Sequence, residues 1–157
     1  MERVHRMEIL DVIIRLLFIA VLIIASAQDI LNQSIYAINI YIITILAVVK
    51  FAVNIVLHNN DYSLIVLNIL FGLVMIIAES KGIKMIGGAD IILICMLSIF
   101  FEKENYLLVL GLSFIGVFIV AVVLLLIGRI HKEETLPFIP FIALGTTVVT
   151  FMNMLSG

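Results

Sequence analysis

The chain has 157 residues, of which 64% are hydrophobic and 13% are charged, and its mean hydropathy is +1.34. Soluble domains contain about 45–50% apolar and about 25% charged residues, and one water-soluble domain of this size cannot bury so much apolar surface. The net charge of −2 argues against nucleic-acid binding, and the single cysteine excludes an intramolecular disulfide and a cysteine-based zinc site. The composition therefore predicts a small polytopic membrane protein.

Six apolar runs follow one another along the chain, each bounded by charged or turn-forming residues. They cover residues 9–27, 35–57, 63–78, 86–101, 107–128 and 137–155. About 20 mostly apolar residues are enough for a helix to cross a hydrocarbon core of about 30 Å, and short connections make consecutive helices antiparallel. We therefore predict an all-α fold in which residues 1–157 form a single domain of six transmembrane helices.

The distribution of basic residues predicts the orientation in the membrane. With six crossings, the ends of the first, third and fifth runs lie on one side. The loops on that side contain four basic residues: Lys81, Lys84, Arg129 and Lys132. The loops on the other side contain only Lys103, although Arg3, Arg6 and Arg15 near the N-terminus also lie there and count against the assignment. Because cytoplasmic loops carry an excess of Lys and Arg, we expect the Lys81 side to be cytoplasmic in a multi-pass protein of the cell membrane.

Two aspartates lie in or beside the apolar runs on this same side. Asp90 precedes the apolar stretch 91–101, which covers only roughly 16–18 Å as a helix, and Asp29 follows the first run. A charge within a span costs about 2.5–3.5 kcal/mol at the helix centre and commonly marks a functional site. Two simpler interpretations exist: Asp90 is the N-cap of its helix, or Asp29 is a helix-end residue that faces water.

Two carboxylates that share a proton form an acid–base pair. One activates a water molecule while the other holds the proton, and this chemistry hydrolyses a peptide bond without a metal or a nucleophilic side chain. The same pair also suits a proton relay or an ion site in a transporter.

Three segments resemble the type IV prepilin peptidases, which are intramembrane aspartyl proteases of the GxGD kind. AQDILNQSI at 27–35 is similar to the segment with the first aspartate of the family, and GGAD at 87–90 is similar to the GxGD motif, with Ala89 replacing its second glycine. LPFIPFIALG at 136–145 resembles the PFxPFxALG segment that opens the last helix. This third segment is the most specific of the three.

The resemblance implies an endopeptidase that cleaves the leader peptide of type IV prepilin-like precursors at the cytoplasmic membrane face, in the short, peptidase-only branch. Asp29 and Asp90 would be catalytic. The residues that would bind substrate or support the site are Gly87, Gly88, Ala89, Pro137, Phe138 and Pro140. The expected partners are a precursor with a hydrophobic N-terminal helix and the lipid bilayer, with no nucleic acid and no cofactor or metal. The alternative is a small proton- or ion-coupled transporter, or a non-catalytic secretion or pilus assembly subunit.

Other polar residues have structural interpretations. Pro137 and Pro140 are equally consistent with the first turn of a helix, where the missing N–H of proline is no loss. Asn54, Asn68 and Ser98 lie inside apolar runs, and we expect them to make hydrogen bonds between helices.

Overall fold

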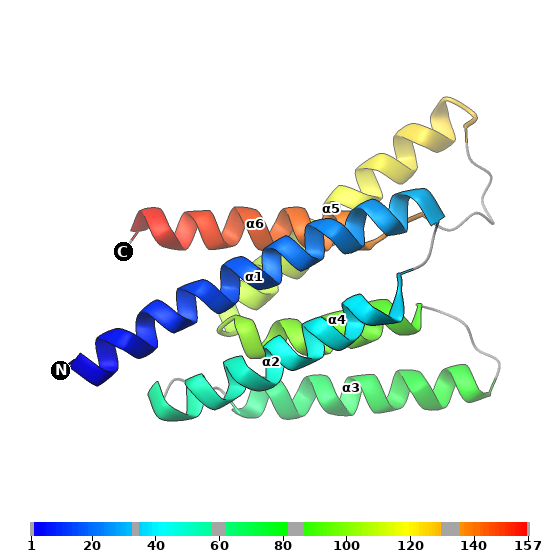
Figure 1. The fold of residues 1–157 in the computed structure, drawn as a ribbon. Coiled ribbons are helices and arrows are strands. Elements are labelled where there is room, and N and C mark those ends of the chain that lie inside the picture. The colour runs from blue at the N-terminus through cyan, green and yellow to red at the C-terminus, as the bar shows by residue number, and fades with distance from the viewer. Residues whose placement is uncertain (1, 33–34, 58–61, 82–86, 130–135, 157) are drawn as a thin grey trace.

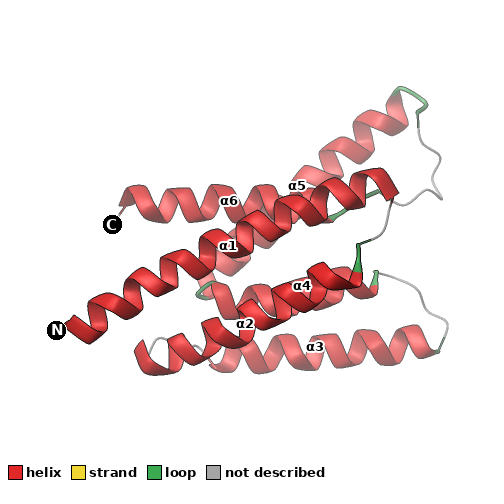
Figure 2. Ribbon diagram, viewed as in Figure 1, coloured by secondary structure: helices red, strands yellow, loops and turns green. Residues whose placement is uncertain are grey.

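The structure is a computed structural model that describes residues 2–32, 35–57, 62–81, 87–129 and 136–156. These residues form six α-helices (Figure 1), and the other described residues are loops and turns (Figure 2). The helices are α1 Glu2–Asn32, α2 Ala37–Leu57, α3 Tyr62–Ser80, α4 Gly88–Phe100, α5 Lys103–Leu126 and α6 Ile139–Ser156. The predicted all-α fold with six helices is confirmed. Two of the basic residues used to predict the orientation, Lys84 and Lys132, lie outside the described residues.

Three helices are long and apolar enough to cross a membrane. The spans are Ile9–Asn32 in α1, Ala37–Leu57 in α2 and Lys103–Leu126 in α5. The other three helices are apolar but shorter, and α4 is the shortest with 13 residues. It covers about 20 Å, well under the thickness of a hydrocarbon core. Lengths and composition are therefore those of a membrane protein in which one central helix is short.

The helices pack into a closed ring. α1 contacts α2 and α6, α6 contacts α5, and α4 completes the ring by packing against α2 and α5, while α3 packs mainly on α4. Both chain termini lie at one end of the bundle, and α1 ends at the other, where α2, α4 and α6 begin (Figure 1). We call the first end the Arg15 end and the second the Asp29 end, after residues of α1 close to each.

The gap between the fourth and fifth apolar runs, residues 102–106, is predicted to be a loop, and this prediction is wrong for most of these residues. α5 already begins at Lys103, with Glu102 as its N-cap and Glu104 in its first turn. Acidic side chains are favourable near a helix N-terminus because they interact with its partial positive charge. The charged residues that suggested a loop are therefore the polar first turn of a helix.

Buried amides link three pairs of helices, as expected for Asn54 and Asn68. The Asn54 amide donates to the carbonyl oxygen of Ile99 at 2.9 Å, which connects α2 to α4. The side-chain oxygen of Asn68 accepts the hydroxyl proton of Tyr106, and its backbone oxygen lies 3.1 Å from the Cys95 sulfur, so α3 is tied to both α5 and α4. The expectation for Ser98 is wrong, because its hydroxyl donates to Cys95 within α4.

Gly145 allows α5 and α6 to approach closely. A Cβ atom built on Gly145 would lie 2.8 Å from the backbone oxygen of Val109 and 3.0 Å from the Ser113 hydroxyl, whereas one on Gly111 would meet nothing within 4 Å. A backbone oxygen cannot rotate out of the way as a flexible side chain can. The packing of α5 on α6 therefore depends on the absence of a side chain at Gly145.

Gly145→Ala should lower the free energy of unfolding by about 1–3 kcal/mol, because the added methyl group forces the two helices apart. Gly111→Ala is the matched control in the same helix pair and should stay within about 0.5 kcal/mol of the wild type. Unfolding of the purified proteins in detergent micelles measures both. Equal stability of the two variants would contradict the close contact between the helices.

Candidate active site

A buried aromatic pair joins α1 to α4. The rings of Phe18 and Phe100 stack with their centroids 3.9 Å apart, and each side chain is 1% exposed. The two helices run in opposite directions (Figure 1). Asp29 lies 11 residues after Phe18, or about 16 Å along α1, and Asp90 lies 10 residues before Phe100, or about 15 Å along α4. The stack therefore brings both aspartates to the same level at the Asp29 end.

Asp29 lies on the buried face of α1. Ile14, Phe18, Leu22 and Ala25 are at most 3% exposed, and Asp29 continues their spacing of three and four residues with an exposed fraction of 8%. α1 extends to Asn32, so Asp29 is still within the helix rather than beyond it. The interpretation of Asp29 as a water-facing helix-end residue is therefore wrong.

The Asp29 carboxylate receives a hydrogen bond from the start of α6. The backbone N–H of Ile139, the first residue of α6, donates to Asp29 Oδ2 at 3.2 Å, and the backbone of Phe138 also approaches the carboxylate. The first N–H groups of a helix have no partner within the helix and carry partial positive charge. Asp29 thus joins α1 to α6 and is itself held in place by backbone.

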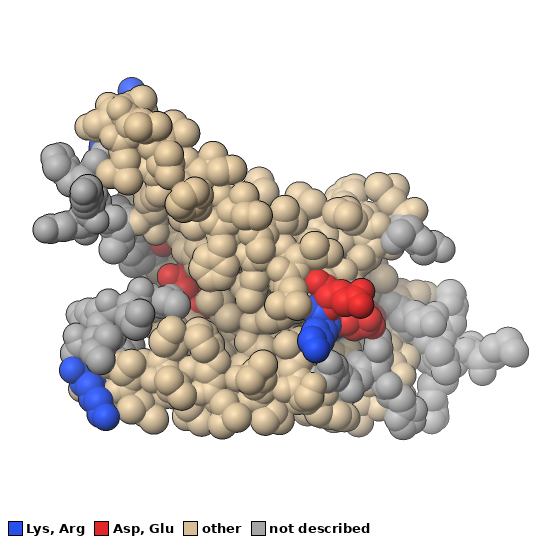
Figure 3. All heavy atoms as spheres, turned by 180° about the vertical axis from the view of Figure 1, so that it is seen from behind, with Lys and Arg blue, Asp and Glu red and all other residues tan. Residues whose placement is uncertain are grey.

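Asp90 lies close to Asp29 without capping its own helix. It is the third residue of α4 and half-buried, while Gly87 is the N-cap and the cap has no side-chain hydrogen bond. The N-cap interpretation of Asp90 is therefore wrong. Asp29 and Asp90 belong to α1 and α4, lie at the same end of the bundle, and are within the range over which one charge influences another. Described acidic side chains are visible near both ends of the face shown in Figure 3, with uncharged residues between them.

The three residues before Asp90 leave its carboxylate accessible from one side. Gly87 and Gly88 are exposed, and Ala89 is half-buried. Gly87 is extended, with φ −62° and ψ 139°, and a Cβ atom there would lie 3.1 Å from Asp90 Oδ2. A side chain at position 87 would therefore crowd the carboxylate that the glycine leaves open.

The segment with the two prolines forms the entry into α6. Pro140 is the second residue of α6, which agrees with the helix-start interpretation, and Pro137 lies two residues before the helix. The Phe138 ring packs against Phe114 of α5, with centroids 5.1 Å apart. This contact fixes the chain just before the N–H groups that face Asp29.

A neighbouring amide that the sequence did not single out helps to hold the site. The Gln28 side-chain oxygen accepts a hydrogen bond from the Asn39 amide at 2.7 Å and one from the Tyr36 backbone at 3.3 Å. These bonds tie the end of α1 to the start of α2, directly beside Asp29. The only signal in the sequence is that Asn39 is a polar residue in an apolar run.

Comparisons of the chain with protein-family models, with curated proteins and with solved structures found no match. The resemblance to prepilin peptidases accordingly rests on the three segments of this sequence.

The hydrogen bond from Ile139 predicts a difference between two replacements of Asp29. Asparagine keeps an oxygen that accepts the Ile139 N–H, so Asp29→Asn should fold like the wild type. Leucine has a similar size but no acceptor, and Asp29→Leu should be less stable than Asp29→Asn by about 1–3 kcal/mol because the buried N–H loses its partner. Thermal unfolding in micelles measures the difference, and equally stable variants would show that the bond contributes nothing.

Proposed function

We propose that the protein is an intramembrane aspartyl endopeptidase that removes the leader peptide of type IV prepilin-like precursors. One observation carries this proposal: two aspartates from α1 and α4, distant in sequence, lie at the same end of the bundle and within range of each other's charge. A pair of carboxyl groups in a largely apolar protein is an arrangement that suits acid–base hydrolysis. The resemblance of the segments 27–35, 87–90 and 136–145 supplies the substrate class.

In this mechanism, the two carboxylates share one proton and hold a water molecule between them. The ionised carboxylate removes a proton from the water as it attacks the scissile carbonyl, and the protonated one stabilises the new oxyanion and then protonates the leaving amine. The roles exchange during the reaction, so the pair acts as a unit. The backbone N–H of Ile139 fixes the orientation of Asp29 throughout.

The substrate is a short basic leader followed by a hydrophobic helix, cut at their junction. An extended backbone can approach Asp90 past Gly87 and Gly88, because neither glycine carries a side chain that would block it. Pro137, Phe138 and Pro140 border the same end of the bundle and support the site from the α6 side. The excess of basic residues in the loops of this end, which include Lys81 and Arg129, favours a cytoplasmic active site.

Asp29→Asn and Asp90→Asn should each slow precursor processing by at least about 100-fold, the usual contribution of a general acid or base. The measurement is co-expression with a prepilin-like precursor, followed by the conversion of precursor to mature form on an immunoblot. Because asparagine keeps the bond from Ile139, loss of processing in Asp29→Asn would reflect lost chemistry rather than lost folding.

Glu104→Gln is the matched control, since it removes an exposed acidic group from the first turn of α5, away from the two aspartates. It should process the precursor at the wild-type rate. Normal processing by either asparagine variant would overturn the two-aspartate mechanism. It would favour the alternative, in which the aspartates belong to a proton or ion pathway.

A further inference from the structure

A second group of charged residues lies at the Arg15 end, far from the two aspartates. Lys50 of α2 is 2% exposed and forms an ion pair with Asp11 of α1. The other Asp11 oxygen accepts a hydrogen bond from Nε of Arg15 at 2.9 Å. The charge on Glu102 also acts on Lys50. Two cations and two anions therefore form one group without net charge.

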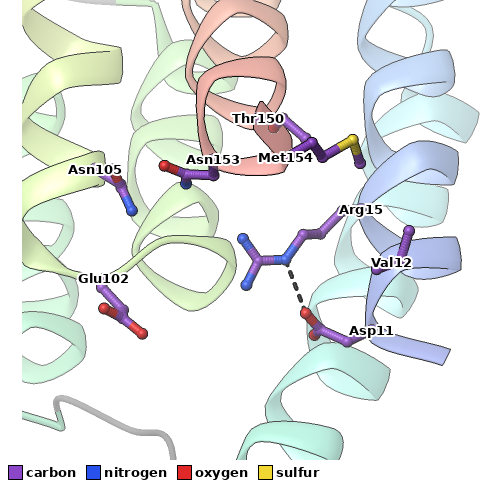
Figure 4. A pocket seen from close by; sticks show the side chains of 8 residues that line it. All are labelled: Asp11, Val12, Arg15, Glu102, Asn105, Thr150, Asn153 and Met154. Atoms are coloured by element: carbon purple, nitrogen blue, oxygen red, sulfur yellow. Dashed lines mark hydrogen bonds and ion pairs between the residues drawn. The ribbon is translucent and has the colours of Figure 1, made fainter. Parts of the chain in front are cut away.

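Three of these residues, Asp11, Arg15 and Glu102, line a cavity of about 380 Å³ between α1, the start of α5 and the end of α6 (Figure 4). Its lining includes Arg15, Glu102, Asn105, Asn153 and Thr150. A volume of this size is typical of small-molecule sites. Val12 and Met154 at its border are 43% and 47% exposed, so the cavity can be reached from the apolar surroundings of the helices.

Arg15 is held in position to present its terminal nitrogens to this cavity. Its Nε is bound to Asp11, and its guanidinium carbon lies 5.9 Å from the centroid of the Phe101 ring. The two terminal nitrogens point away from Asp11 into the space bordered by Asn105, Asn153 and Glu102 (Figure 4). An immobilised guanidinium fork is the side chain best suited to bind a phosphate or carboxylate through two hydrogen bonds.

A second observation points to a ligand. Thr150 lines the cavity and is 3% exposed, yet its hydroxyl oxygen has no hydrogen-bond partner among the described residues. A buried hydroxyl without a partner is costly, and threonine in a helix commonly satisfies its hydroxyl on the preceding turn. Here the hydroxyl is an unsatisfied polar group in a residue that lines the cavity.

We propose that this cavity binds the phosphoethanolamine headgroup of a membrane lipid. The phosphate lies against the Arg15 fork and the Thr150 hydroxyl, and the ammonium group lies against the Glu102 carboxylate and the Asn105 side chain. A zwitterion preserves the neutrality of the four charges, whereas a purely anionic group would bring a second negative charge next to Glu102. The apolar border at Val12 and Met154 receives the first carbons of the acyl chains. This site is independent of the proposed peptidase activity.

The test compares lipids that share acyl chains and differ in headgroup. Thermal unfolding of the wild-type protein is followed in mixed micelles with phosphatidylethanolamine, phosphatidylglycerol or phosphatidylcholine at equal mole fraction, because a ligand that binds the folded state raises the melting temperature. Phosphatidylethanolamine should stabilise most. Phosphatidylglycerol lacks the ammonium group, and the trimethylated amine of phosphatidylcholine cannot donate to Glu102.

The variant Thr150→Val tests whether the cavity binds lipid or has only a structural role. Valine has the same shape, and in the absence of lipid the variant should be at least as stable as the wild type, since no hydrogen bond is lost. In the presence of phosphatidylethanolamine it should show an apparent affinity at least about fivefold lower. Arg15→Lys, which keeps the charge and loses the fork, should weaken binding at least about tenfold.

Glu102→Gln should remove the preference for phosphatidylethanolamine over phosphatidylglycerol, and Glu104→Gln, two residues along, should retain it.

Soluble phosphoethanolamine at millimolar concentration is the second ligand to test. It should not raise the melting temperature, because it lacks the acyl chains. A shift as large as that of the lipid would assign the cavity to a soluble phosphate compound and overturn the lipid proposal. Equal stabilisation by all three lipids, or an unchanged response of Thr150→Val and Arg15→Lys, would overturn the headgroup site altogether.

Discussion

The stacking of Phe18 on Phe100 is the contact on which the candidate active site depends. It fixes how far α1 and α4 are displaced along one another, and a displacement of one helical turn, about 5.4 Å, would remove Asp29 from the level of Asp90. Both rings are buried among apolar side chains from several helices, so the register is held by close packing rather than by the aspartates themselves. Packing in the interior of the bundle thus positions the two carboxyl groups at its end.

Several polar groups inside this apolar bundle form hydrogen bonds with a second helix. The Asp29 carboxylate accepts a backbone N–H of α6, Gln28 binds Asn39 of α2, and Asn68 binds Tyr106 of α5. In a membrane, an apolar side chain gains little by contacting another helix rather than a lipid tail. Close packing and hydrogen bonds between helices therefore determine which helices pack together. The contact at Gly145 belongs to the same class, because two backbones can approach only where no side chain intervenes.

The two ends of the bundle differ in their electrostatics. At the Asp29 end, two carboxyl groups from α1 and α4 lie together, an arrangement that suits proton transfer. At the Arg15 end, Asp11 pairs with both Lys50 and Arg15, and Asp11, Arg15 and Glu102 line a cavity. Pairing offsets part of the cost of burying these charges, and such a group can receive a ligand that carries both charges. The proposed hydrolytic and lipid sites therefore lie at opposite ends of α1 and differ in their charges.

The sequence by itself determined the class of protein, the six helices and the unusual aspartates, because apolar composition, run length and isolated charges are properties of the chain alone. It also indicated that Asn54 and Asn68 join helices. Only the tertiary structure decided that Asp29 is buried on the core face of α1, that Asp90 does not cap α4, and that residues 103–106 are helical rather than a loop. It alone showed that Gln28 binds the start of α2 and that the Thr150 hydroxyl has no hydrogen-bond partner among the described residues. The reason is physical: a helix has the same local geometry whether its polar residue faces water, lipid or another helix, and only the packing of distant segments determines which.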